Sequence, residues 1–582
     1  MMSKKKIDFN MYWYLLAVVV ISIFITLPQL YHHVTIIGTD SLFHYNRFYD
    51  VAMQIKHHNF SYFMQLYGFL NSGRIVTAVY SPGITYLLGG LLLVCGSFFR
   101  FAIVTRLLFF ILAALSMNSA LKIMRVKNSV LVQLVSVLYA FTPAINSWGM
   151  AQNFSGIGAI CLPLIFGCGV RMLKRPEHPI SWLQLGGIMA IVLQTHLATA
   201  IQSIVILIFY AVLALIINPK SRWKLVKNGI AAALLCIGLS LNIIAGMLEL
   251  YVDNIIVPVV AFDLKSGKGI YHLLYLSDGG WVNLFFILIV LVIMLSGFKR
   301  LSIETKATGL LSVVLFLFAT AMIVDWPTVM ASNPILNNTL QFPGRLKGPA
   351  ITAALITIAS VDSSYFSGRV RRYSKPALVG VLALFAFTNM VGNFRYSRNA
   401  SQQVLSSRAV LPDLKRTKKL KQSLTEVMRS PLSDRTVNLI TKSTPDYMPA
   451  TRLPNQPVYG EYQRQIIRPS KNSSHVNRFG YEKVVRKHQI VVKWQGNGSY
   501  RTIPIAFYHN SRFQLNGQKI TPKRAKGILR LPLVREGSGK NVLRVTYHPR
   551  VISRLLLNLS MLNWVLMIVG MAIYEYRKRK DD

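Results

Sequence analysis

Asp40, His44 and Arg47 are the residues of this chain whose types and spacing could most directly do chemistry. Their spacing of four and three residues would place all three side chains on one face of a helix. A carboxylate in such a position can take a proton from an attacking hydroxyl group, while the His and the Arg orient it or bind a phosphate. Two structural roles fit the same residues. Asp40 could cap a short helix at the membrane surface, because Gly-Thr-Asp-Ser is a good N-cap signal, or the three side chains could form an interfacial salt bridge.

Further polar and aromatic side chains lie beside apolar runs. Gln341-Phe342-Pro343-Gly344-Arg345 precedes one such run, and Arg345 could either bind a phosphate with its forked guanidinium or serve as an interfacial anchor. His196 lies within an apolar region, where it is either at an outer turn or a hydrogen-bonded core histidine. The candidate substrate-binding residues are Tyr80, Trp148, Gln152, His196, Gln341, Asp446 and Tyr447.

The segments that must position these residues are mostly apolar runs. The 582 residues are 52% hydrophobic with a mean hydropathy of +0.41, which predicts an α-helical polytopic membrane protein. The predicted spans lie near 11–30, 81–97, 101–121, 129–146, 155–170, 183–199, 200–217, 227–246, 281–297, 307–324, 349–361, 377–393 and 552–573.

The orientation follows from the basic residues at both ends of the chain. Lys4-Lys5-Lys6 and the tail 577–580 both favour the cytoplasm, so the number of crossings should be even. The run 81–97 is short and rich in glycine, and we expect it to be interfacial or re-entrant. Twelve crossings are then the best estimate, with thirteen or fourteen as alternatives. This orientation places the loop 31–80 and the segment 394–550 outside a cell membrane.

Three regions are predicted: a membrane domain over 1–393, an extracytoplasmic domain over 394–550, and a last helix with a basic cytoplasmic tail over 551–582. The external segment carries 31 Lys and Arg against 7 Asp and Glu, a net charge of 31 − 7 = +24. Its first part, about 395–430, is polar with helical spacing. From about 480 onward, short alternating runs separated by turns such as Asn516-Gly517 predict a small β-sandwich.

The formal net charge of +44 indicates anionic partners. Anionic lipid head groups or anionic wall polymers fit this charge, whereas nucleic acid does not suit a chain whose bulk lies in a bilayer. The cysteines Cys95, Cys161, Cys168 and Cys236 all fall in apolar runs, so neither a disulfide framework nor a cysteine-based zinc site is expected. The sequence supports no metal site and no certain cofactor.

The order of the polar motifs resembles that of the YfhO-like bacterial membrane proteins, whose relatives are often labelled "6-pyruvoyl-tetrahydropterin synthase-related". The β-rich end, with Ile503-Pro-Ile and Leu515-Asn-Gly, is also similar to that family's external domain. The motifs that carry the resemblance are Asp40-x-x-x-His44-x-x-Arg47, Tyr80-x-Pro82, Gln341-Phe-Pro-x-Arg345 and Asp446-Tyr-Met-Pro449.

This resemblance implies a GT-C glycosyltransferase fold and transfer of a sugar from a polyprenyl-phosphate donor to a cell-envelope polymer such as lipoteichoic or teichoic acid. It implies Asp40 as the catalytic base, with His44, Arg47 and Arg345 as supporting or phosphate-binding residues. A pterin synthase would instead need a zinc-binding histidine set on a compact soluble fold, which this chain does not supply.

The chain departs from the family pattern at two places. Gly344 stands where the family has Trp, so an aromatic platform is missing. The turn at 146–154 contains neither the Arg nor the acid that relatives usually have there. If a second carboxylate is needed, Glu249 and Asp253 in a later outer loop are the expected substitutes.

Two readings from other classes stay open. A transporter or flippase for a lipid-linked solute would place charged residues deep within the spans, and the sequence has few there. A non-catalytic scaffold would use the cationic external domain to hold wall polymers, and the charge of that domain fits this role as well as it fits an enzyme.

Overall fold

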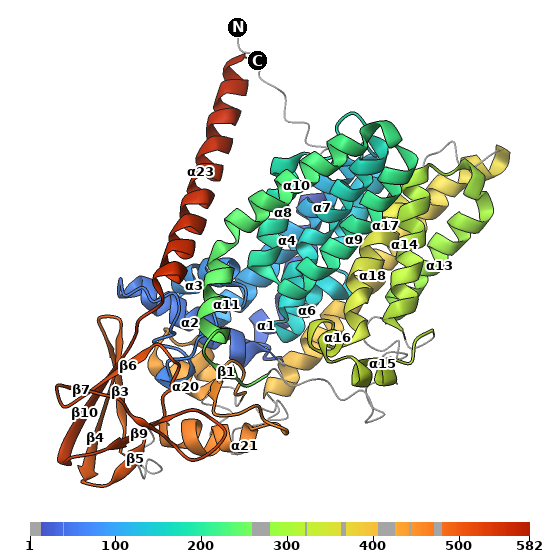
Figure 1. Ribbon diagram of the computed structural model, residues 1–582. Helices are drawn as coiled ribbons and strands as arrows, with labels where there is room; N and C mark the ends of the chain where they lie inside the picture. The colour runs from blue at the N-terminus through green and yellow to red at the C-terminus, as the bar shows by residue number, and fades with distance from the viewer. Residues whose placement is uncertain are drawn as a thin grey trace.

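The computed structural model describes residues 13–38, 40–127, 129–258, 280–320, 323–361, 368–405, 425–440, 444–470 and 480–581. The chain is mostly helical, and a small β-rich domain lies directly before the last helix (Figure 1), which confirms the predicted fold class. Lys4-Lys5-Lys6, which support the predicted orientation, lie outside the described residues.

Each of the predicted apolar runs forms a helix or a pair of helices. They are α1 (Trp13–His32), α3 (Pro82–Cys95), α4 (Phe98–Ile123), α5 (Ser129–Ala140) with α6 (Pro143–Ala151), α7 (Phe154–Lys174), α8 (Trp182–Thr195), α9 (Leu197–Ile217), α10 (Arg222–Leu239) with α11 (Leu241–Tyr251), α13 (Gly280–Gly297), α14 (Ile303–Ala319), α17 (Lys347–Ser360), α18 (Gly368–Leu405) and α23 (Val551–Asp581).

Fewer of these helices are long enough to cross a bilayer than the sequence predicts. By length and composition, seven spans occur among the described residues, or eight when the bent pair of α10 and α11 counts as one. The helices α3 and α8 have only 14 residues each, which gives about 21 Å at about 1.5 Å per residue. That is short of the ~30 Å hydrocarbon core, as predicted for the run 81–97.

The β-rich domain contains two antiparallel sheets. One has the order β3-β4-β10-β6-β7 and the other β5-β9-β8. Buried side chains from both sheets, among them Trp494, Val534 and Leu543, form one apolar cluster between them. Asn516 and Gly517 form the two-residue turn between β6 and β7 with φ angles of 48° and 91°, which confirms the predicted hairpin. The strands are β3 (Glu482–Arg486), β4 (Gln489–Asn497), β5 (Tyr500–Thr502), β6 (Ser511–Leu515), β7 (Gln518–Ile520), β8 (Lys523–Arg524), β9 (Pro532–Arg535) and β10 (Ser538–Tyr547).

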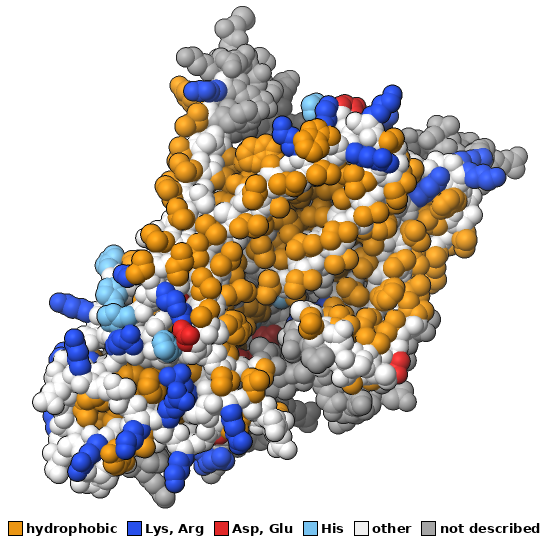
Figure 2. Space-filling view, viewed as in Figure 1, with side chains coloured by type: hydrophobic (Ala, Val, Ile, Leu, Met, Phe, Trp, Pro, Cys, Tyr) orange, Lys and Arg blue, Asp and Glu red, His pale blue; other side chains and the backbone are white. Residues whose placement is uncertain are grey.

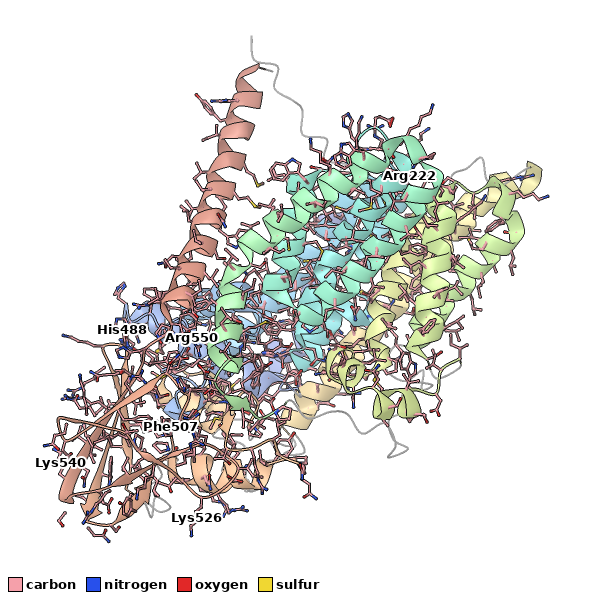
Figure 3. The ribbon with its side chains drawn as sticks, in the orientation of Figure 1. Arg222, His488, Phe507, Lys526, Lys540 and Arg550 are labelled. Atoms are coloured by element: carbon pink, nitrogen blue, oxygen red, sulfur yellow. The ribbon has the colours of Figure 1, made fainter. Side chains whose placement is uncertain are left out.

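The molecule has an apolar belt between two polar ends. Figure 2 shows hydrophobic side chains covering the helical bundle, with Lys and Arg gathered beyond it at both ends. Arg222 lies at the end opposite Lys526 and Lys540 of the β-rich domain (Figure 3). Near that opposite end, Lys174 and Arg175 donate hydrogen bonds to the last carbonyl groups of α4, as basic residues commonly do at helix C-termini.

An outer layer joins the bundle to the β-rich domain. Its main element is α2 (Ser41–Lys56), whose side chains are buried from Ser41 to Gln54, and which packs beside α3. Short elements complete this layer: η2 (Phe69–Asn71), η7 (Pro343–Leu346), α20 (Asp434–Leu439), and the paired strands β1 (Ile255–Ile256) and β2 (Pro449–Ala450). The segments that carry Asp40, Tyr80, Arg345 and Asp446 meet in this layer.

Candidate functional site

Asp40 stands at the N-cap position of α2, but its side chain makes no capping hydrogen bond to the helix. The loop before the helix is fixed by other groups. The Asp40 N–H donates to the Ala151 carbonyl over 3.2 Å, while the Gly38 N–H and the Ser41 hydroxyl both donate to Gln152 Oε1. The half-buried carboxylate is therefore not needed to start the helix.

His44 and Arg47 lie behind this carboxylate, on one face of α2 as predicted. The Arg47 guanidinium is fully buried and donates to the Tyr80 carbonyl and the Thr85 hydroxyl. Its Nη1 lies 3.1 Å from His44 Nδ1, and its Cζ lies 4.7 Å from the centre of the Tyr80 ring. Because Arg47 is fully enclosed, the structure gives it the role of holding the chain at Tyr80, and a phosphate could reach it only after rearrangement.

Tyr80 is the electrostatic centre of the cluster. Burial raises the pKa of its phenol to about 12, with the charges of Asp40 and Asp446 adding to the rise and those of Arg47 and Arg345 opposing it. These residues come from three regions far apart in the sequence: the loop 31–80, the segment at Arg345 and the segment at Asp446. The structure thus brings together the predicted residues 40, 80, 345 and 446 around one partly exposed tyrosine.

Arg345 reaches this cluster from η7. Its Cζ lies 4.9 Å from the centre of the Phe342 ring, and Nη2 donates to Gln341 Oε1. Burial lowers the pKa of the Arg345 guanidinium, and the nearby Tyr80 and Asp40 act against that effect. Arg345 is therefore a half-buried cation in the outer layer, within electrostatic reach of the Asp40 carboxylate.

His196 lies in the turn between α8 and α9 and is buried. Its Nδ1 accepts from the Thr199 N–H over 3.3 Å and lies 2.8 Å from the Thr199 hydroxyl. Burial and the charge of Arg345 lower the pKa of His196 to about 3, so the ring is neutral near pH 7. His196 is thus a hydrogen-bonded buried histidine that also lies within electrostatic reach of Arg345.

Asp446 and Tyr447 are held against the loop 31–80 by groups that were not among the predicted site residues. Arg74, which is fully buried, donates to the Asp446 carbonyl, and the Tyr508 hydroxyl donates to the Tyr447 carbonyl over 2.7 Å. The Tyr447 ring stacks on Tyr80 with 6.5 Å between centroids. The only sequence signal for Arg74 was its position after Gly73 in the predicted outer loop 31–80.

Trp148 and Gln152 are not at the exposed surface of the cluster. The Trp148 indole is 2% exposed and donates to the Thr105 hydroxyl over 3.1 Å. Gln152 is 3% exposed, and its amide bridges the loop at Gly38 to the Trp148 carbonyl. Both side chains support the Asp40 loop from behind.

Left-handed backbone conformations gather at this site. Ser81, Gln152, Gln341 and Tyr447 all have φ between 50° and 63°, although none of them is glycine. Such conformations cost of order 1–3 kcal/mol each and cluster at functional sites, where the surrounding structure enforces them. Each lies next to, or is itself, one of the candidate residues.

Glu249 and Asp253, expected as substitutes for a second carboxylate, do not serve the site. The Glu249 carboxylate is fully buried and accepts from Asn510, the Tyr547 hydroxyl and the Arg550 N–H. Asp253 pairs with the Arg550 side chain. These bonds join α11 to the β-rich domain and the last helix. The expectation was wrong because sequence position in an outer loop does not show which partners a carboxylate has already taken. Asp446 is the second acid whose charge reaches Tyr80.

Asp50 is a buried acid that was not among the predicted site residues. Its Oδ1 accepts from the N–H groups of Leu66 and Tyr67, both over 2.8 Å, and its Oδ2 accepts from Gln54. Burial raises the pKa of Asp50 to about 6 despite these hydrogen bonds. Asp50 fixes the loop that leads to Tyr80. Among the described residues, no three His, Cys, Asp or Glu side chains are grouped to hold a metal ion.

No protein-family model and no curated protein matches this chain. Solved structures of an oligosaccharyltransferase from Archaeoglobus fulgidus are similar to it. The apo form has 11% identity and a TM-score of 0.38, covering 75% of this chain and 64% of that chain. AglB in complex with an inhibitory peptide and a dolichol-phosphate has 12% identity and a TM-score of 0.39, covering 73% and 62%. The form tethered to an acceptor peptide with the NVT sequon has 11% identity and a TM-score of 0.38, covering 74% and 63%. The chain thus spans less than two thirds of the length of these proteins, and a likeness this low assigns it to no family.

Proposed function

We propose that this chain is a membrane glycosyltransferase that moves a sugar from a polyprenyl-phosphate donor to a cell-envelope polymer at the outer face of the cell membrane. The observation that supports this best is the meeting of Asp40, Tyr80, Arg345 and Asp446 in the outer layer. A carboxylate next to a partly exposed Arg, beside an apolar belt, suits a reaction between a hydroxyl group and a phosphate-linked lipid. The resemblance to YfhO-like proteins and to a GT-C fold agrees with this proposal.

In the proposed reaction, Asp40 accepts the proton of the acceptor hydroxyl as its oxygen attacks the anomeric carbon of the donor sugar. The bond between that carbon and the phosphate oxygen breaks, and the lipid phosphate leaves with the electron pair. Arg345 stabilises the charge that develops on this phosphate. Tyr80 and Tyr447 present stacked rings on which a sugar can lie. Arg47 holds the Tyr80 carbonyl, and the Tyr508 hydroxyl holds the Tyr447 carbonyl.

The acceptor is proposed to be a polyanion such as lipoteichoic or teichoic acid. The segment 394–550 has a net charge of +24, and the basic side chains labelled in Figure 3, Lys526 and Lys540, project from the β-rich domain. Contacts with a repeating phosphate chain would be numerous and screened beyond about 8 Å at physiological salt. The alternative of a domain lying on an anionic leaflet predicts binding to vesicles in place of soluble polymer.

The substitution Asp40→Asn tests the proposal. Asn keeps the shape of the side chain but cannot accept the proton, so glycosylation of the envelope polymer should fall by ~10²-fold or more. Asp325→Asn is the matched control, because Asp325 is an acid of another outer segment whose carboxylate accepts from Thr328. Near-normal glycosylation by folded Asp40→Asn protein would contradict the catalytic role.

One observation bears on the alternative of a transporter: a charged side chain is buried within a membrane span. The Arg106 guanidinium in α4 is 2% exposed and donates to Gln29, Asn146 and Ser397. These bonds tie α1, α4, α6 and α18 together. Because the neighbouring helices already fix this charge, we assign Arg106 a packing role and retain the glycosyltransferase as the proposed function.

A further inference from the structure

A large apolar groove lies between the last helix and the bundle, on the side of α3 that faces away from Arg47. Its volume is about 960 Å³, at the upper end of the ~300–1,000 Å³ typical of ligand pockets. Its walls come from the loop 60–64, from α3, α8 and α11, and from α23. In Figure 1 the last helix runs along the bundle from the β-rich domain toward the opposite end.

The back of the groove is a polar seam whose groups already bind one another. The bend of 58° between α10 and α11 leaves carbonyl groups without helical partners. The Leu239 carbonyl accepts from Ser560 and Trp564, and Asn242 exchanges hydrogen bonds with Gln194. The last helix is therefore firmly docked at this seam.

The rest of the lining is apolar and open to the belt. Leu87 on α3 is 70% exposed, and Met561 and Ile568 on α23 are 60% and 61% exposed. Because the polar groups of the seam are paired, a ligand gains little from polar contacts at this depth. A hydrocarbon chain is the ligand that this lining fits.

The outer end of the groove is different, because it is basic. His488 lines the groove there, and it binds the loop after α2 through the Asn59 side chain and the Phe60 carbonyl. This contact brings the turn between β3 and β4 to the end of α2. Exposed basic side chains of both segments therefore share one rim: Lys56, His57, His58, Arg486, Lys487 and His488. Figure 2 shows His and Lys or Arg side chains gathered at this border between the apolar belt and the β-rich domain.

We propose that this groove binds one anionic glycerolipid, with an acyl chain against the last helix and the phosphate on the basic rim. A polyprenyl-phosphate donor fits less well. The first turns of α3 separate the groove from the candidate site: Thr85 contacts Arg47 on one side, while Ile84 and Leu87 line the groove on the other. The lipid site is thus distinct from the proposed donor site and does not depend on the proposed function.

Native mass spectrometry of the full chain in detergent tests this site. The wild-type protein should bind one phosphatidylglycerol at least tenfold more tightly than phosphatidylcholine with the same chains. The double variant Lys56→Gln with Lys487→Gln should bring the two lipids near parity, since each basic residue at a membrane surface contributes about fivefold.

Variants that fill the groove with larger side chains provide a second test of the lipid site. Met561→Trp with Ile568→Trp should lower the bound fraction of phosphatidylglycerol tenfold or more. Leu562→Trp with Val569→Trp is the matched control, because these residues are the next positions on α23, are 52% and 48% exposed, and do not line the groove. Leu87→Trp tests the opposite wall if the first variant is not monodisperse. Equal lipid binding by the groove and control variants would overturn the proposal. Displacement of phosphatidylglycerol by equimolar polyprenyl phosphate would do the same and would assign the groove to the donor.

Discussion

Glu249→Gln is expected to loosen the attachment of the β-rich domain to the bundle. The Glu249 carboxylate is fully buried, with Oε2 accepting from Asn510 over 2.9 Å and from Tyr547 over 2.6 Å. Its Oε1 accepts from the Arg550 N–H over 2.8 Å and lies 3.5 Å from Arg550 Nη1. A glutamine has one carbonyl oxygen, so at least one of these donors must face an N–H₂ group.

The size of the effect follows from these contacts. A buried donor left without an acceptor costs about 1–3 kcal/mol, and the remaining hydrogen bonds each lose about 1 kcal/mol when their acceptor becomes neutral. The sum is roughly 3–5 kcal/mol, which is the range measured when one partner of a buried ion pair is removed. The lower end corresponds to an opening of the interface about 100-fold more frequent, since ~1.4 kcal/mol is a factor of ten.

Hydrogen exchange on the purified full chain measures this opening. The amides of Ala506 and Ile75 report on it, because Ala506 donates to the Ser72 carbonyl and Ile75 donates to the Tyr508 hydroxyl across the interface. Their protection should fall about 100-fold or more, given the ~3 kcal/mol lower bound.

Glu482→Gln is the control for this measurement. Glu482 lies in an exposed pair with Lys493, which is worth at most ~1 kcal/mol. Its loss should change protection by about fivefold or less. The reasoning about Glu249 is refuted if Glu249→Gln and Glu482→Gln give the same exchange at the interface. If Glu249→Gln is not recovered folded, Tyr547→Phe removes one of the same hydrogen bonds and should lower protection about tenfold, as a charged hydrogen bond is worth ~1.5 kcal/mol or more.

The remaining predictions concern the site, its support and the orientation. Arg345→Lys should lower sugar transfer by about 10- to 100-fold, because a lost forked contact costs ~1.5–3 kcal/mol and Lys cannot restore it, whereas full activity would mark Arg345 as an interfacial anchor. Asp50 has a pKa of about 6 in the folded chain against an ordinary 3.8, so the folded state binds its proton more tightly. Stability should therefore fall by about 2 kcal/mol as pH rises from 4 to 6, and thermal unfolding of Asp50→Asn should lack this slope. Asn497→Cys should be labelled by an impermeant thiol reagent on intact cells, and labelling only after permeabilisation would reverse the predicted orientation.

The helices and the hairpins could be predicted because their signals are local. Apolar runs fix helices wherever they occur, and Asn516-Gly517 fixes a turn through φ angles that only a few residues adopt readily. The number of membrane-crossing helices could not be predicted equally well. Whether a run such as 183–199 gives a helix of 14 residues depends on where its neighbours force a break, as at His196.

The candidate site could be predicted only as a list of residues. Asp40, Tyr80, Arg345 and Asp446 were each found from local motifs, yet nothing local indicates that the loop 31–80 meets the distant segments at Arg345 and Asp446. The partners of a charge are equally hidden. Glu249 and Asp40 look alike in the sequence, as acids in segments predicted to lie outside. In the structure, Glu249 is enclosed by Asn510, Tyr547 and Arg550, whereas Asp40 is half-buried.

The β-rich domain contributes to the candidate site because its Tyr508 holds Tyr447 in position. The Tyr508 hydroxyl joins the domain to both sides of the cluster, because it accepts from the Ile75 N–H and donates to the Tyr447 carbonyl. Tyr447 in turn stacks on Tyr80, whose carbonyl is held by Arg47. A loosened domain would therefore withdraw the Tyr447 ring while leaving Asp40 in place. Substitutions at the domain interface should then weaken acceptor or sugar binding more than the proton transfer step, whereas Asp40→Asn should affect the proton transfer step alone.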